Sequence, residues 1–239
     1  MKNSSAVAVV GETLSEKCRA SLSSLGFSVI ILPAYQKLGD AVSSHADMLI
    51  CPINNKIFTF SEYAEKNYNL MDALSAKGCG ICRVSEEPKE KYPNDVLLNC
   101  LTVGDRIFSK TDFTSCELKK YAREQGYTFI NVNQGYARCT ACPVSDNAII
   151  TADPSIAKAA TVCGLHLLTV SQGHVKLAGY EYGFIGGTCG VFEERIFFAG
   201  DLMSHPDGEK IAEFCRLHGK QVISLSDELL TDVGSIFFF

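Results

Sequence analysis

The feature that most constrains the fold of this chain is an internal repeat. Five times along its 239 residues, a glycine is followed by a short apolar stretch of the kind that forms a strand. The five glycines are Gly26, Gly78, Gly126, Gly164 and Gly219, spaced 52, 48, 38 and 55 residues apart. A supersecondary unit repeated at such intervals is typical of stacked arrays and propellers, in which each unit buries its apolar face against its neighbours.

Helix and turn signals surround each of these glycines. A helical pattern precedes every one, and the glycine supplies the left-handed residue that ends a helix. Thr13–Glu16 is typical of a capping box, Asp153-Pro154 of an N-cap followed by proline, and Ser204 of the start of the last helix. Ahead of four of the helices, two apolar runs flank a polar turn, which predicts a hairpin. The four turns lie at residues 54–56, 104–106, 145–147 and 193–195.

The repeated unit is therefore predicted to be strand–strand–helix–strand, intact four times and split once between the chain ends. The split unit would combine Val7–Val10, the first helix and Val29–Leu32 with Val233–Phe239. We predict one α/β domain, a closed five-bladed propeller, because closure removes the exposed strand edges. The alternative, an open doubly wound sheet, needs neither five matched units nor paired ends. The five units are expected at about 1–44 plus 230–239, 45–93, 94–136, 137–183 and 184–229.

Composition excludes several kinds of partner. The chain has 22 Lys and Arg residues against 27 Asp and Glu, a net charge of −5 and no basic block, so nucleic acid is not expected. No apolar run approaches the roughly 20 residues of a membrane span, so no membrane partner is expected. Eleven scattered cysteines predict reduced, mostly buried thiols and a cytoplasmic location. We expect no cofactor and no metal, and the sequence leaves a homo-oligomer possible.

Two Cys-x-x-Cys pairs raise the alternative of a zinc site. Cys79 and Cys82 form one pair, Cys139 and Cys142 the other, and 56 residues separate the pairs. Structural zinc sites place roughly 12–20 residues between such pairs. Residues i and i+3 of a strand also face opposite sides of the sheet, which is poor geometry for chelation. The spacing therefore disfavours zinc at these pairs.

In a closed ring, the residues just ahead of each hairpin face a common centre. Asp47, Asp95 and Asp232 would share that opening, with His45 beside Asp47. Crowded carboxylates raise each other's pKa unless a cation relieves them, and a planar guanidinium pairs with carboxylates through two hydrogen bonds. We therefore predict that these residues bind a small cationic, guanidino-like ligand. The alternative for each aspartate is a cap on a turn.

The repeat, together with four local sequences, resembles the guanidino-group-modifying (pentein) superfamily, and most closely an uncharacterised bacterial branch of it. The four sequences are Gln134–Cys139, Gly173-His174, Tyr182–Gly187 and His205–Asp207. The superfamily includes arginine and agmatine deiminases, dimethylarginine dimethylaminohydrolases and amidinotransferases, and the resemblance covers essentially the whole chain. It implies a thiolate that attacks the guanidinium carbon, a histidine acting as general acid and base, and carboxylates that hold the cation. Gln134 is a further candidate for substrate binding.

The chain departs from the superfamily at the nucleophile. The hydrolases carry this cysteine near the chain end, where Gly234 and Ser235 stand here. Pseudo-symmetry offers Cys139 and Cys189 in other blades as candidate nucleophiles, and His174, in a glycine-bounded loop, is the candidate acid and base. We therefore predict a cysteine-dependent hydrolase or amidinotransferase-like enzyme acting on a guanidino or related cationic nitrogen compound. The alternative is a catalytically inactive pentein-fold protein that binds a small ligand or a macromolecular partner.

Overall fold

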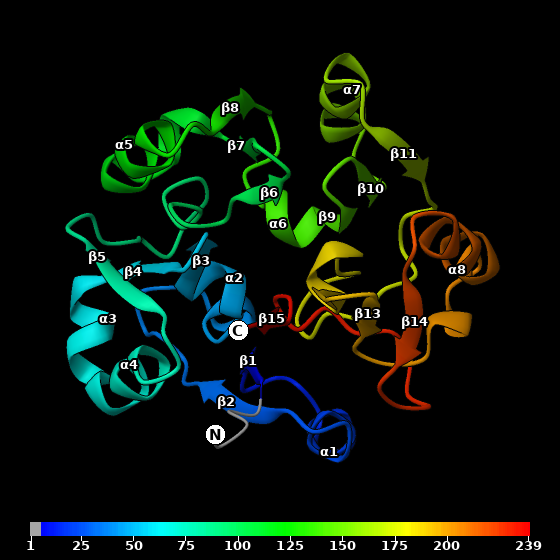
Figure 1. Cartoon of the computed structure of the whole chain (residues 1–239), viewed down its shortest axis with the longest axis horizontal. Helices are drawn as coiled ribbons and strands as arrows, with labels where there is room; N and C mark the ends of the chain where they lie inside the picture. The colour runs from blue at the N-terminus through cyan, green and yellow to red at the C-terminus, as the bar shows by residue number, and fades with distance from the viewer. Residues whose placement is uncertain (1–5) are drawn as a thin grey trace.

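The computed structural model describes residues 6–239 as five three-stranded sheets placed around a central axis (Figure 1). In each sheet the middle strand pairs antiparallel with one neighbour and parallel with the other. The blades are β15 (Phe237–Phe238), β1 (Val7–Gly11) and β2 (Ser28–Leu32); β3 (Ile50–Ile53), β4 (Lys56–Phe60) and β5 (Gly80–Val84); β6 (Leu101–Val103), β7 (Arg106–Ser109) and β8 (Thr128–Asn131); β9 (Ala141–Ser145), β10 (Ala148–Thr151) and β11 (His166–Thr169); and β12 (Cys189–Phe192), β13 (Arg195–Phe198) and β14 (Gln221–Ser224).

Helices connect the two parallel strands of every blade and lie on the outside of the ring (Figure 1). They are α1 (Glu16–Ser24), α3 (Ser61–Lys66) with α4 (Tyr68–Ser75), α5 (Cys116–Glu124), α7 (Pro154–Val162) and α8 (Gly208–Leu217). At all five repeat glycines the backbone is left-handed, with φ between 71° and 92°. Because residues with a Cβ rarely adopt this conformation, glycine ends each helix and turns the chain into the outer strand.

The two ends of the chain complete one blade, as the sequence predicted. Ala8 pairs with Phe238 in an antiparallel register, and Val7 and Phe239 exchange backbone hydrogen bonds of 2.7 and 2.9 Å. The ring of Phe238 packs on Phe27 and Phe197, with ring centroids 4.9 Å apart in both pairs. The fold is therefore the predicted closed five-bladed α/β propeller.

Two helices begin later than their sequence patterns suggested. The N-cap of α1 is Ser15 rather than Thr13, because the Ser15 hydroxyl accepts the N–H of Cys18. The helix α8 begins at Gly208 rather than at Ser204, since a 3₁₀ turn, η4 (Leu202–Ser204), comes first and the N–H of Asp207 is held by the His205 ring.

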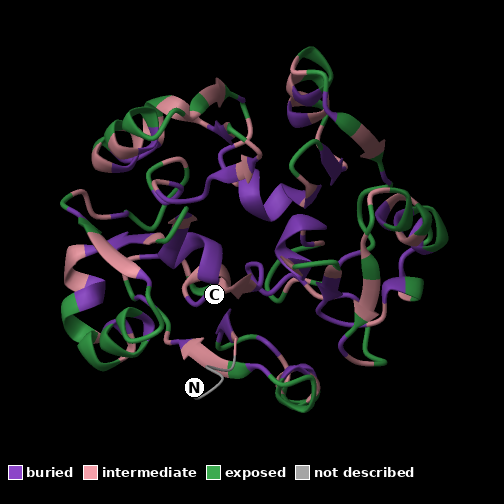
Figure 2. Ribbon diagram, viewed as in Figure 1, coloured by how far each residue is buried: buried purple, intermediate pink, exposed green. Residues whose placement is uncertain are grey.

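Three further helical turns lie at the centre of the ring. They are α2 (Ala46–Leu49), α6 (Ala137–Thr140) and the 3₁₀ helix η3 (Gly186–Thr188), which lead directly into β3, β9 and β12. All of their residues are buried, and Figure 2 shows them facing one another around the axis. Other 3₁₀ turns are η1 (Asp40–Val42) and η2 (Thr111–Phe113). Within residues 6–239, no helix combines the length and the apolarity needed to cross a membrane.

Candidate active site

The central helical turns and the C-terminal segment hold the polar residues of the ring axis. Asp47 lies in α2 and Cys139 in α6. The N–H of Asp47 donates to the Gly234 carbonyl at 2.9 Å, and the N–H of Ser235 donates to the Gly187 carbonyl at 2.8 Å. Residues far apart in sequence therefore meet at fixed positions. We call His45, Asp47, Cys139, Asp232 and Ser235 the central cluster.

The thiol of Cys139 is held by two polar neighbours. Its Sγ lies 3.1 Å from both Asp47 carboxylate oxygens, so the thiol can donate to that carboxylate. The Asn99 amide donates to the same sulfur at 3.1 Å, and the Ser235 hydroxyl donates to Asp47 Oδ2 at 2.6 Å. The sulfur is thus placed between a hydrogen-bond donor and a carboxylate that is itself oriented from the C-terminal segment.

His45 is the unpaired member of the central cluster. Its side chain is 1% exposed, and neither ring nitrogen has a hydrogen-bond partner among the described residues. Its Nδ1 lies 3.8 Å from Asp232 Oδ1, beyond hydrogen-bond distance. A buried imidazole without partners is costly, so a group that enters the site to bind it would be stabilising.

Asp232 sits in a cradle of backbone. Its two carboxylate oxygens accept the N–H groups of Phe184 at 2.9 Å and Gly234 at 3.1 Å. A Cβ at position 187 would lie 1.8 Å from Asp232 Oδ1, and one at position 234 would lie 2.2 Å from the Cβ of His45. Glycine is required at both positions so that the backbone can approach these side chains.

Burial shifts the pKa values of the four titratable residues of the central cluster. Burial raises the pKa of Asp232 to about 6 and also raises the pKa of Asp47. Burial, followed by the charges of Asp47 and Asp232, raises the pKa of the Cys139 thiol well above its usual range. Burial lowers the pKa of His45, against the pull of Asp47. At neutral pH the cluster therefore contains a protonated thiol, a neutral imidazole and an ionised Asp232.

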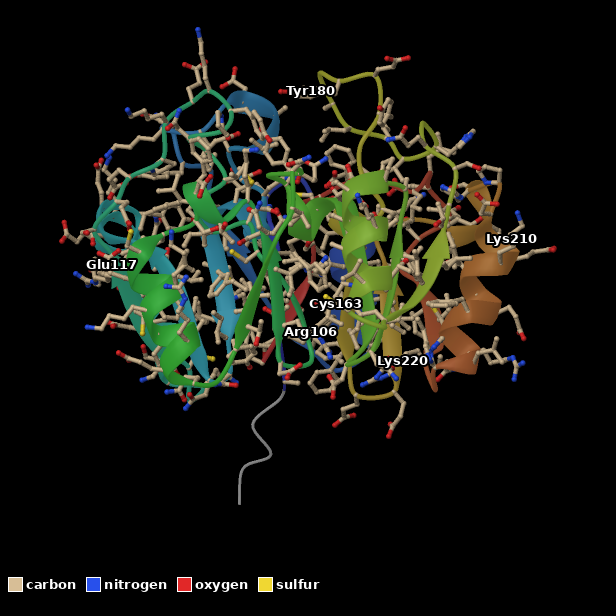
Figure 3. All side chains as sticks on the ribbon, turned by 90° about the horizontal axis from the view of Figure 1, so that it is seen from above. Arg106, Glu117, Cys163, Tyr180, Lys210 and Lys220 are labelled. Atoms are coloured by element: carbon tan, nitrogen blue, oxygen red, sulfur yellow. The ribbon has the colours of Figure 1, made fainter. Side chains whose placement is uncertain are left out.

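A cavity of about 110 Å³ opens onto this cluster. Its polar lining comes from His45, Cys139 and Asp232. The rest of its lining is apolar or aromatic, namely Val42, Tyr136, Leu177, Tyr180, Tyr182 and Phe184. The cavity has room for several water molecules, and so for a planar cationic group rather than a whole large ligand. In Figure 3 Tyr180 marks one face of the molecule, and Arg106 and Lys220 lie toward the other.

Asp95, one of the predicted ligand-binding carboxylates, lies behind the cavity and holds Tyr136 by a hydrogen bond. Its Oδ2 accepts the Tyr136 hydroxyl, and its buried Oδ1 has no hydrogen-bond partner within residues 6–239. Burial raises the pKa of Asp95. Tyr136 lines the cavity and the Asp95 carboxylate does not. Asp95 therefore holds one member of the aromatic wall, which consists of Tyr136, Tyr180, Tyr182 and Phe184.

The other predicted site residues lie away from the cavity. His174 is exposed, and its ring packs on His205 at 5.5 Å between centroids. Gln134 bonds to Asp153 and to the N–H of Tyr136, which orders the loop ahead of α6.

Cys189 is fully buried in the apolar core that contains Cys142 and Cys215. Its Sγ lies 3.3 Å from the Gly186 carbonyl, where the thiol can donate a hydrogen bond. Burial acts to raise the pKa of Cys189, but Cys142 and the charge of Arg138 outweigh it and lower the pKa. The Cys189 sulfur does not line the cavity, so the structure gives it no access to a ligand there.

Sequence analysis missed Asn99 and the aromatic wall. Asn99 stands just ahead of β6, as Asp47 and Cys139 stand ahead of β3 and β9, so its place in the repeat was the available signal. Tyr182 and Phe184 belong to a segment quoted for the family resemblance without a role. Nothing in the sequence indicated that Ser235 adopts a left-handed backbone with φ of 70°.

The donor atoms could also meet a metal ion. One ligand atom each from His45, Asp47 and Cys139 lies within 4.8 Å of the others. Nitrogen, oxygen and sulfur donors of this kind suit zinc, with the cavity side of the cluster as an open position.

Enzymes that modify guanidino groups share this fold. A dimethylarginine dimethylaminohydrolase from Pseudomonas aeruginosa, solved with citrulline, superposes with a TM-score of 0.56 over 92% of both chains at 10% identity. The inosamine-phosphate amidinotransferase of Streptomyces griseus gives 0.54 over 90% of this chain and 74% of its own, at 13% identity. An amidinotransferase from Microseira wollei gives 0.54 over 87% and 72%, at 12% identity. The chain therefore has the fold of the guanidino-group-modifying, or pentein, superfamily.

A narrower assignment comes from the sequence family. Residues 9–237 match a family of unknown function, DUF6873, and the chain belongs to it. No curated protein is similar to the chain in sequence.

Proposed function

We propose that the chain is a cysteine-dependent enzyme that breaks a C–N bond of a guanidino or related cationic nitrogen compound, with Cys139 as nucleophile. One observation carries this proposal: a thiol at the wall of a small acidic cavity has a carboxylate at 3.1 Å and an unpaired buried histidine within 4.8 Å. The pentein fold is consistent with this chemistry. His45 takes the acid and base role in place of His174, because His45 lines the cavity and His174 does not.

The cation itself would activate the thiol. Without ligand, burial and the charges of Asp47 and Asp232 hold Cys139 in its protonated form. A guanidinium bound beside Asp232 places a positive charge near the sulfur. A nearby positive charge stabilises the thiolate and therefore lowers the thiol pKa. Cys139 is therefore reactive only when substrate is present.

The proposed reaction forms and then breaks a bond to the Cys139 sulfur. The Cys139 sulfur bonds to the guanidinium carbon, and the bond from that carbon to one nitrogen breaks. The thiol proton leaves through Asp47 and His45 and ends on the departing amine. Water then attacks the amidino-thioether, which releases a ureido product and the free thiol, or a second amine takes the amidino group. The sulfur must stay reduced throughout, which suits a cytoplasmic setting.

The test is product formation with matched cysteine variants. The protein is incubated with arginine, agmatine and N-methylated arginines, and the ureido product and released amine are quantified. We expect Cys139→Ser to lose turnover and Cys189→Ala to keep it, with a stability loss on the order of 1 kcal/mol from its core position. Intact-protein mass spectrometry should show a substrate-derived adduct that Cys139→Ser abolishes. Full turnover by Cys139→Ser would refute the proposal.

A further inference from the structure

The walls of the cavity restrict which cation can enter it. Tyr136 is fixed by its hydroxyl on Asp95, and Phe184 by its N–H on Asp232. The two rings lie 6.5 Å apart, and the ring of Tyr182 stands at 82° to Phe184 with the same 6.5 Å separation. Aromatic rings attract cations and pack well on alkyl groups, so this wall is suited to the head and the methylene tail of a cationic ligand.

No lysine or arginine lines this cavity among the residues the structure describes. Lys176 precedes the lining residue Leu177 and is exposed, but it is not part of the lining. The one histidine of the described lining, His45, has its Nδ1 3.8 Å from Asp232 Oδ1. A ligand carboxylate would therefore find no lysine or arginine partner here.

Arg138, a buried cation whose charge acts on Asp47 and Asp232, makes its hydrogen bonds elsewhere. The guanidinium of Arg138 donates to the carbonyls of Gly186 at 2.8 Å and Cys189 at 3.0 Å. Arg138 lines a separate cavity of about 200 Å³, together with residues of the hairpin strands such as Thr102 and Pro143. It is therefore not placed to receive the carboxylate of an amino acid bound beside Asp232.

We infer that the site selects a guanidino or amidino compound that carries no carboxylate, such as an alkylguanidine or a guanidinoalkylamine, over an amino acid such as arginine. This inference rests on the ligand class of the proposed function and narrows it. The cation pairs with Asp232, and the uncharged or cationic tail leaves between the aromatic side chains toward Tyr180. A carboxylate on that tail would lie among the aromatic side chains at the mouth of the cavity, where no lysine or arginine of the described lining can pair with it. A charged group that loses water without gaining a partner is unfavourable.

Comparing arginine, agmatine and arginine methyl ester distinguishes the effect of the carboxylate's charge from the effect of its size. Agmatine is arginine without its carboxylate, and arginine methyl ester keeps the size of the carboxyl group but removes its charge. Calorimetry on the full chain at pH 8 should show both binding at least about tenfold more tightly than arginine. Initial rates with the three compounds should follow the same order.

A gain-of-function variant gives the sharper result. Tyr180 is 62% exposed, so Tyr180→Lys should fold and should place a positive charge at the mouth of the cavity. We expect it to bring the affinity for arginine to within about threefold of that for agmatine. Leu229→Lys adds the same charge at a site 65% exposed and away from the cavity, and should leave the ratio unchanged.

The outcomes distinguish this inference from the proposed function. Agmatine bound at least about tenfold more tightly than arginine, but without turnover, would uphold the selectivity and refute the cysteine chemistry. Turnover with arginine bound as tightly as agmatine would refute the selectivity and uphold the chemistry. An unchanged ratio of agmatine affinity to arginine affinity in Tyr180→Lys would overturn the inference. Binding of none of the three ligands would overturn both the inference and the proposed function.

Discussion

At the scale of single residues, the site depends on the buried carboxylate of Asp232. Asp232 is fully buried, receives two backbone N–H groups and faces an imidazole that it does not quite reach. Its oxygens leave no room for a Cβ at position 187. Backbone N–H groups hold this carboxylate in place, and it lines the cavity where a ligand can reach it.

The ionisation of Asp232 gives a prediction with a defined sign. Its pKa is about 6 in the folded chain against an ordinary value of 3.8, so between these pH values the folded state holds a proton that the unfolded state has lost. Stability therefore falls as pH rises from about 4 to about 6, by up to about 3 kcal/mol from this group. Asp232→Asn should remove that fall. Denaturant unfolding of both proteins between pH 4 and 8 measures the difference.

The same group should control ligand binding. Affinity for a guanidinium should rise as pH passes through about 6, because only ionised Asp232 attracts the cation. Asp232→Asn should bind weakly at every pH. Equal binding by the two proteins at pH 8 would show that Asp232 does not hold the cation.

At the scale of elements, short helical turns convert a repeated blade into a site. The sequence patterns predicted the hairpins but not the helical turns α2, α6 and η3, which precede β3, β9 and β12. In a helical turn, residues two and three positions before the strand can both face the axis. Asp47 and Cys139 occupy such positions in blades that face each other across the centre.

The cap of α7 provides an element-scale prediction. Asp153 accepts the N–H groups of Ser155 at 2.8 Å and Ile156 at 2.9 Å, and its other oxygen accepts the Gln134 amide. Asp153→Ala should cost about 1–2 kcal/mol and lower the melting temperature by about 2–8 °C. Ser15→Ala removes a longer cap bond of 3.4 Å at the start of α1 and an exposed hydrogen bond of 2.7 Å to Glu228, and should cost less. Equal melting temperatures for Asp153→Ala and the parent would show that the cap adds nothing.

At the scale of the whole molecule, stability depends on closing the ring. The strand β15 supplies the third strand of the first blade, and Ile236 is buried beside it in the core that joins the first and fifth blades. The C-terminal segment also carries Asp232 and Ser235 into the central cluster. Closure thus serves both the core and the site.

Deleting residues 236–239 should therefore abolish cooperative unfolding. The deletion removes the partner of β1 and four apolar side chains, a loss of more than about 5 kcal/mol against a typical total stability of 5–15 kcal/mol. Thermal unfolding followed by circular dichroism is the measurement. Leu229→Ala, at an exposed position of the same terminal region, is the control and should melt like the parent. A truncated chain with the parent's sharp transition would mean that ring closure is dispensable.

The sequence by itself determined the fold because its signals are local. Helix-ending glycines, polar hairpin turns and a blade divided between the chain ends act through backbone preferences within a few residues. The same patterns placed Asp47, Asp232, His45 and Cys139 near the axis. Only the tertiary structure showed that Cys139 and His45 line the cavity, whereas Cys189 and His174 do not. Pseudo-symmetric positions look equivalent along the chain, and side-chain direction is decided by distant neighbours. One thiol meets a carboxylate 92 residues away, while the other packs among apolar side chains.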